Sequence, residues 1–153
     1  MKKLTLFLAL VIITGFAMAQ SAPLSKGEKQ LNFGLGFGSG LPGYFGMDFA
    51  VHNDITVGGG LGINLDGFDY LTIAGRGDYH FNTLIGIPSE WDFYAGLNLG
   101  FVVGLNDYGG SSGLDLGGQV GGRYYWSDKW GVNLELGGGL INYGGKVGVT
   151  MKL

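Results

Sequence analysis

The chain has 153 residues, a formal net charge of −3 and no cysteine. Its mild acidity argues against nucleic acid as a partner, and the lack of cysteine excludes a disulfide framework. Only 14% of the residues are charged, against about 25% in an average soluble domain, which is too few to cover the surface of a soluble protein.

The first residues have the pattern of a secretory signal peptide. Lys2 and Lys3 precede an apolar stretch over 4–16, and residues 17–19 (Ala-Met-Ala) form the small-x-small pattern of a cleavage site. A membrane anchor or a buried helix is the alternative, but a spanning helix needs roughly 20 apolar residues and this stretch is shorter. We therefore predict a signal peptide over 1–19, a polar lead over 20–30 and one domain over 31–153.

After the polar lead, apolar residues alternate with small or polar ones. Leu31, Phe33 and Leu35, for example, are separated by single Asn and Gly residues. A period of two indicates strands with one apolar face, and no helical spacing follows the first stretch. The pattern predicts eight strands, over 31–37, 45–51, 55–63, 71–81, 91–103, 114–126, 130–140 and 147–153.

Short connections rich in turn-forming residues separate these strands. They lie at 41–43, 52–54, 65–69, 106–112, 127–129 and 142–145. Short connections force neighbouring strands to be antiparallel, and eight strands can close on themselves and leave no unpaired edge. The predicted fold is all-β, an eight-stranded antiparallel up-and-down transmembrane β-barrel.

Two closed barrels fit this alternation, and each is the other turned inside out. A soluble lipocalin-like lipid carrier would place the apolar phase inside, whereas a membrane barrel would place it against lipid. The second phase consists mostly of Gly, Asn, Thr and Ala, which cover a soluble surface poorly but fit a narrow lumen. This composition favours the membrane barrel.

Large aromatic residues gather beside the turns at 82–90 and 127–129. Membrane barrels carry aromatic girdles where lipid meets water, so we predict one at this rim, on the periplasmic side. The alternative is that these residues are simply good strand formers. The predicted girdle comprises Phe49, Tyr79, Phe81, Trp91, Phe93, Tyr124, Trp126 and Trp130.

The Gly-aromatic strands, the hairpin over 122–130 (GRYYWSDKW) and the apolar last strand resemble the family of small outer-membrane β-barrels. This family includes the membrane domain of outer membrane protein A and related small porin-family barrels. The resemblance implies location in the outer membrane, outer-membrane lipid as a partner and recognition of the last strand by the barrel assembly machinery. In the family that strand ends in an aromatic residue, whereas this chain ends in Leu153.

The inward phase of the strands carries the polar chemistry. Pairing Trp126 with Trp130 across the tight turn sets Arg123 opposite Asn133 and diagonal to Glu135, so we predict an Arg123–Glu135 ion pair. Arg76 is expected to meet Asp78, Asp48 or another carboxylate, because charges removed from water need partners. The predicted lumen network comprises Asp48, Arg76, Asp78, Asn98, Gln119, Arg123 and Glu135, with His80, Asp92, Asp115, Lys146 and Lys152 also inside.

Two further features depart from a regular strand pattern. The glycine triplets at 58–60 and 137–139 predict kinks or bulges, because glycine permits sharp bends in a narrow barrel. The connection over 82–90 is longer than the other periplasmic turns and carries Leu84, Ile85, Ile87 and Pro88. It could rest on the membrane interface or fold beneath the barrel.

The sequence carries no enzyme signature, and we predict no catalytic residue, cofactor or metal site. His80 with Asp78 gives only two metal ligands, and the glycines never lead into a helix as a phosphate-binding loop would. The leading hypothesis is a monomeric outer-membrane protein with a structural or interaction role and no catalysis. A narrow porin-like channel for ions or small solutes is the alternative, and a soluble lipid carrier, a surface binding module and an enzyme rank below it.

Overall fold

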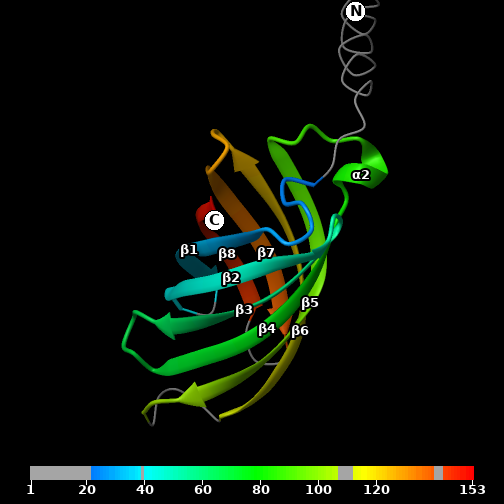
Figure 1. Ribbon diagram of the computed structural model, residues 1–153. Helices are drawn as coiled ribbons and strands as arrows, with labels where there is room; N and C mark the ends of the chain where they lie inside the picture. The colour runs from blue at the N-terminus through cyan, green and yellow to red at the C-terminus, as the bar shows by residue number, and fades with distance from the viewer. Residues whose placement is uncertain (1–21, 39, 107–111, 140–142) are drawn as a thin grey trace, which may run out of the picture.

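The structure is a computed structural model that describes residues 22–38, 40–106, 112–139 and 143–153 (Figure 1). The predicted signal peptide over 1–19 lies outside the described residues. Within the described part of the chain, no helix is long and apolar enough to cross a membrane.

Eight strands form one closed antiparallel barrel in the described residues, and each strand pairs with its neighbours in chain order (Figure 1). The predicted up-and-down topology is confirmed. A single helical turn, α2, connects β4 to β5. The elements are β1 (Lys29–Gly38), β2 (Pro42–His52), β3 (Ile55–Asn64), β4 (Tyr70–His80), α2 (Asn82–Ile85), β5 (Trp91–Gly104), β6 (Gly113–Tyr125), β7 (Trp130–Gly139) and β8 (Tyr143–Lys152).

The barrel has two ends, which we name by what lies there. The terminal end carries the start of β1, the end of β8 and the turns after β2, β4 and β6. The loop end carries the connections after β1, β3, β5 and β7. The terminal end corresponds to the predicted periplasmic side.

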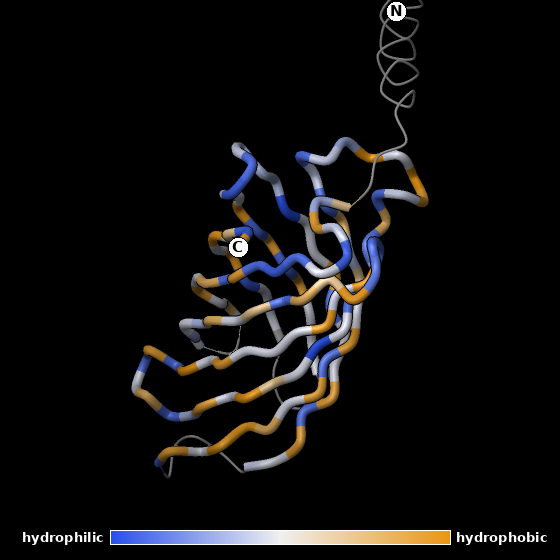
Figure 2. The backbone as a smooth tube through the Cα atoms, in the orientation of Figure 1, coloured by the Kyte–Doolittle hydropathy of each residue, from blue (hydrophilic) through white to orange (hydrophobic). Residues whose placement is uncertain are grey.

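The barrel is inside out relative to a soluble protein. Side chains alternate across a strand, and the apolar phase here is exposed, as for Leu97, Leu134 and Val147, while the buried side chains are mostly polar. Figure 2 shows the same alternation of hydrophobic and hydrophilic residues along the strands. A lipocalin-like carrier requires an apolar interior, so that alternative is wrong for this barrel.

The register of the β6–β7 hairpin is the one predicted from the tight turn, with Arg123 opposite Asn133. The bulges expected at the glycine triplets are absent, because pairing runs without a register shift through 58–60 and through 137–139. The β2–β3 register instead shifts between Ala50 and His52.

The inward glycines have another purpose, which is to make room for large side chains that face them. A Cβ atom on Gly121 would collide with the ring of Tyr94, and one on Gly139 would collide with the Asp115 carboxylate. A narrow barrel fills its interior by setting small residues opposite large ones.

The polar lead also differs from the prediction. Strand β1 begins at Lys29, so Lys29 and Gln30 belong to the barrel. Ahead of it, the Gly27 amide donates to the Ala50 carbonyl at 2.8 Å, and the segment 22–28 folds back beside the end of β2 (Figure 1). Ala22 and Leu24 are buried there, so the lead covers part of the terminal end rather than trailing into solvent.

Candidate functional site: the polar lumen

The polar residues predicted for the lumen lie on the inward phase of their strands. Arg76 and Asn98 are half-buried and the others are buried. The residues are Asp48, Arg76, Asp78, Asn98, Gln119, Arg123 and Glu135.

Arg123 is the centre of the cluster nearest the terminal end. Its Nη2 atom lies 2.9 Å from Asp48 Oδ2 and its Nη1 atom 2.7 Å from Asp92 Oδ2. The guanidinium carbon also lies 4.1 Å from the centroid of the Tyr94 ring, in a cation–π arrangement. With a relative exposure of 2%, this arginine joins β2, β5 and β6 across the interior.

Side chains from the first and last strands complete this cluster. Gln30 Nε2 and Asn32 Nδ2 both donate to Asp48 Oδ2, each at 2.9 Å, and the Tyr125 hydroxyl donates to Gln30 Oε1 at 2.6 Å. The Thr150 hydroxyl donates to Asn32 Oδ1 at 2.8 Å. We call this layer the lumen floor: Gln30, Asn32, Asp48, Asp92, Arg123, Tyr125 and Thr150, all of them buried.

His80 stands between a carboxylate and a hydroxyl. Its Nδ1 atom lies 2.6 Å from Asp92 Oδ1 and its Nε2 atom 3.0 Å from Thr56 Oγ1. This Asp–His–Thr order resembles a nucleophilic triad, but the three side chains are buried and none of them lines the cavity described below. The arrangement orients the imidazole and links β3, β4 and β5.

Arg76 organises a second cluster, nearer the loop end. Its Nε atom lies 2.7 Å from Asp78 Oδ2, and its Nη2 atom lies 2.7 Å from Glu135 Oε2. Lys146 Nζ reaches Glu135 Oε1 at 3.1 Å, and Gln119 Nε2 donates to Asp78 Oδ1 at 2.8 Å. The pairing of Arg76 with a lumen carboxylate agrees with the sequence-based expectation.

The predicted Arg123–Glu135 ion pair is wrong. Tyr94 separates the two residues, because its ring faces the guanidinium of Arg123 while its hydroxyl donates to Glu135 Oε2 at 3.0 Å. Arg123 pairs with Asp48 and Asp92, and Glu135 pairs with Arg76 and Lys146. The diagonal neighbours of the hairpin thus belong to different clusters.

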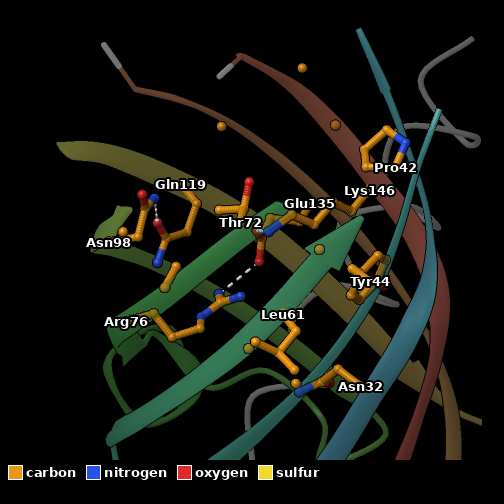
Figure 3. Close-up of a pocket in the computed structure, with 18 of the residues that line it drawn as sticks. Asn32, Pro42, Tyr44, Leu61, Thr72, Arg76, Asn98, Gln119, Glu135 and Lys146 are labelled. Carbon is orange, nitrogen blue, oxygen red and sulfur yellow. Dashed lines mark hydrogen bonds and ion pairs between the residues drawn. The ribbon is translucent and has the colours of Figure 1, made fainter. Parts of the chain in front are cut away.

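A cavity of about 200 Å³ occupies the loop-end part of the lumen (Figure 3). Pro42 and Tyr70 line it near the loop end, and Asp48 and Arg123 line its deepest part. Inward glycines such as Gly62 form much of the wall, which explains why space remains there. Its lining includes Asn32, Asp48 and Arg123 of the lumen floor but none of the other floor residues.

The predicted lumen network does not include several residues that the structure places in the lumen. Tyr44 and Tyr94 are uncharged but lie on the inward phase of β2 and β5, and each donates its hydroxyl hydrogen within the lumen. Gln30 was assigned to the polar lead, although it shares the phase of Asn32. The period of two could have found all three, because phase and not charge decides which face a side chain takes.

The predicted aromatic girdle residues lie at the terminal end with outward-facing rings. Trp91 is stacked on Phe93 with ring centroids 6.0 Å apart and contacts Tyr124 at 4.7 Å, and Tyr79 meets Phe81 edge-on at 5.3 Å. The residues Phe49, Tyr79, Trp91, Phe93, Tyr124, Trp126 and Trp130 are exposed, and Phe81 is partly exposed.

The described residues include no cluster of three or more His, Cys, Asp or Glu side chains that could hold a metal ion. Arg, Lys, His and amide groups of the chain itself instead pair with the lumen carboxylates Asp48, Asp78, Asp92 and Glu135. The chemistry of the lumen is therefore that of a network of charge pairs and hydrogen bonds.

Comparison with family models and with curated protein sequences gives no match. Solved structures do match. The N-terminal β-barrel domain of Pseudomonas aeruginosa OprF has a TM-score of 0.65 at 17% identity, covering 85% of this chain and 100% of that one. Outer membrane protein OprG from the same organism has a TM-score of 0.56 at 11% identity, covering 86% and 99%.

A third match, Ail from Yersinia pestis in a phospholipid bilayer nanodisc, has a TM-score of 0.54 at 14% identity and covers 84% of this chain and 100% of that one. At these identities the likeness is one of fold. The chain has the fold of the small eight-stranded outer-membrane β-barrels.

Proposed function

We propose that this chain is a non-catalytic outer-membrane barrel with a structural or interaction role, whose lumen does not conduct. The lumen floor carries the proposal. Arg123, Asp48 and Asp92 are fully buried and joined by direct ion pairs, and side chains of β1, β6 and β8 pack around them. An eight-stranded barrel has an interior just wide enough for side chains to fill, and here they meet across it.

The proposal includes location and partners. The signal pattern over 1–19 supports export, and the apolar outer face with its aromatic rim supports insertion into the outer membrane with lipid as the direct partner. The barrel assembly machinery would recognise the last strand, β8. A barrel whose strands are all paired has no edge that needs a second copy, so we expect a monomer.

The geometry also supports the proposal that the chain is not an enzyme. The Asp–His–hydroxyl arrangement of Asp92, His80 and Thr56 is enclosed and lies away from the cavity. A substrate entering from the loop end would meet the lumen floor first.

A narrow channel remains the second candidate, and one observation favours it. The cavity extends from the loop end as far as Asp48 and Arg123, so it already reaches residues of the lumen floor. Rearrangement of a few side chains would join the two sides.

Conductance across planar lipid bilayers distinguishes these candidates. The mature chain would be refolded in detergent and its folding verified by heat-modifiable gel migration. We expect no stepwise conductance from the unmodified chain or from Lys146→Ala, which alters the cavity but not the floor, and measurable steps from Arg123→Ala. Resolved steps from the unmodified chain, of the size seen with Arg123→Ala, would reject the closed lumen and establish the channel.

A further inference from the structure

The connection between β4 and β5 is the longest one at the terminal end that the structure describes, and it has a defined shape. The Phe81 amide donates to the Phe93 carbonyl at 2.8 Å, and the Trp91 amide donates to the Pro88 carbonyl at 2.9 Å. Between these two points, α2 ends at Ile85 and is capped by Gly86, whose φ of 65° is left-handed and favours glycine. The connection is therefore fixed to the barrel at both ends.

Side chains hold the connection against the rim as well. Asn82 is fully buried, and its Nδ2 atom donates to the Trp91 carbonyl. The Thr83 hydroxyl donates to Asp54 Oδ1 in the turn after β2. The polar side chains of Asn82 and Thr83 thus form hydrogen bonds with the barrel and its turns.

Two apolar residues of the connection, Leu84 and Ile85, are exposed, whereas Ile87 is half-buried. Leu84 has a relative exposure of 67% and Ile85 of 52%, although both belong to a segment that is otherwise well fixed. The connection projects from the rim away from the barrel mouth, and Figure 2 shows hydrophobic residues at its outer edge (Figures 1 and 2). It does not fold beneath the barrel, which was one of the two sequence-based expectations.

The surroundings of these two residues match a lipid interface. Residues 81–89 (FNTLIGIPS) contain no charged side chain. The connection also continues the aromatic girdle, since it begins at Phe81, which packs on Tyr79, and ends next to Trp91, which stacks on Phe93. Aromatic girdles mark the level at which a barrel leaves the hydrocarbon, and short apolar helical faces can lie in the headgroup region just beyond.

We infer that Leu84 and Ile85 insert into the lipid leaflet at the terminal end and act as an interfacial anchor. The partner is the phospholipid surface itself. The inference rests on the barrel spanning a membrane but not on whether its lumen conducts. An anchor on one side of the rim restrains both the depth of the barrel and its tilt.

The lack of cysteine in the chain makes a clean test possible. The variant Ile85→Cys would carry one environment-sensitive fluorophore, and Asp128→Cys would carry the same fluorophore in the exposed turn after β6, at the same end of the barrel. Both would be refolded into phosphatidylcholine vesicles with and without a lipid that is spin-labelled near its headgroup. Heat-modifiable migration would verify insertion of each variant.

The expected result is a blue-shifted emission at position 85 and quenching by the spin-labelled lipid several times stronger than at position 128. Adding Leu84→Asn to the Ile85→Cys variant should weaken the quenching, because one of the two apolar contacts is lost. Equal, water-like emission and equal quenching at both positions would overturn the inference. Shielding of position 85 that appears only after addition of a periplasmic extract would overturn it too, since the surface would then bind a protein.

Discussion

Removal of the Arg123 charge should destabilise the barrel far more than removal of the Lys146 charge. Arg123→Met keeps an apolar stem against Tyr94 but leaves Asp48 and Asp92 without their shared cation. Breaking a buried ion pair by removing one partner typically costs about 3–5 kcal/mol. Both carboxylates retain other donors, Asp48 from two amides and Asp92 from His80, so we expect the lower end, about 3 kcal/mol.

Lys146→Met is the matched control. The Lys146 side chain is 45% exposed and makes an ion pair with Glu135, which also keeps Arg76. Partly solvated pairs contribute about 0–1 kcal/mol, so the two variants should differ by about 2 kcal/mol or more. The assay is reversible urea unfolding from lipid vesicles, followed by tryptophan fluorescence.

A third variant shows how much of the lost stability comes from leaving the Asp48 and Asp92 carboxylates charged and without their cation. When Arg123→Met is combined with Asp48→Asn and Asp92→Asn, both carboxylates become neutral and much of the lost stability should return. A loss for Arg123→Met no larger than that for Lys146→Met would refute the reasoning. It would mean that the lumen floor is solvated and does not close the barrel.

Three further outcomes follow from the packing. Gly121→Ala should cost about 1–3 kcal/mol in the same unfolding assay because its Cβ meets the Tyr94 ring, whereas the outward Gly77→Ala should have little effect. Leu134→Arg places a cation on the apolar outer face and should cost up to about 2–4 kcal/mol in a bilayer, and a neutral effect would place that face outside lipid. Thr56→Val removes the hydroxyl beside the buried histidine and should cost about 1 kcal/mol, with conductance unchanged.

The architecture could be predicted from the sequence because the period of two is a local signal. The alternation in runs such as 91–103 indicates which side chains face outward. The tight turn at 127–129 fixes the register of Arg123 against Asn133. Short connections then leave antiparallel neighbours as the only arrangement, so strand order follows without long-range information.

The lumen pairs could not be predicted in the same way. Arg123 meets Asp48 across 75 positions of sequence, and that contact depends on how the closed barrel staggers its strands. The hairpin register placed Glu135 diagonal to Arg123, but Tyr94 from β5 lies between them and directs each to another partner. Hairpin geometry indicates which residues could form ion pairs, but the pairs that form depend on how the barrel closes.

The terminal end shows the same limit. Leu24 is buried and Leu84 is exposed, although both are leucines in segments without alternation. Their positions depend on tertiary contacts, namely the hydrogen bonds of the segment 22–28 with β2 and those of Asn82 and Thr83 with the rim. Composition alone does not carry that information.

The most direct test of the central claim is the lipid exposure of consecutive positions in one strand. Single cysteines at Leu97, Asn98 and Leu99 of β5 would carry a spin label in lipid vesicles, and the collision rate with oxygen would be measured. The inside-out barrel predicts high oxygen accessibility at 97 and 99 and low accessibility at 98, because the leucines face outward and the asparagine faces the lumen. The opposite phase, or uniform accessibility at all three positions, would contradict a transmembrane barrel with a polar, closed interior.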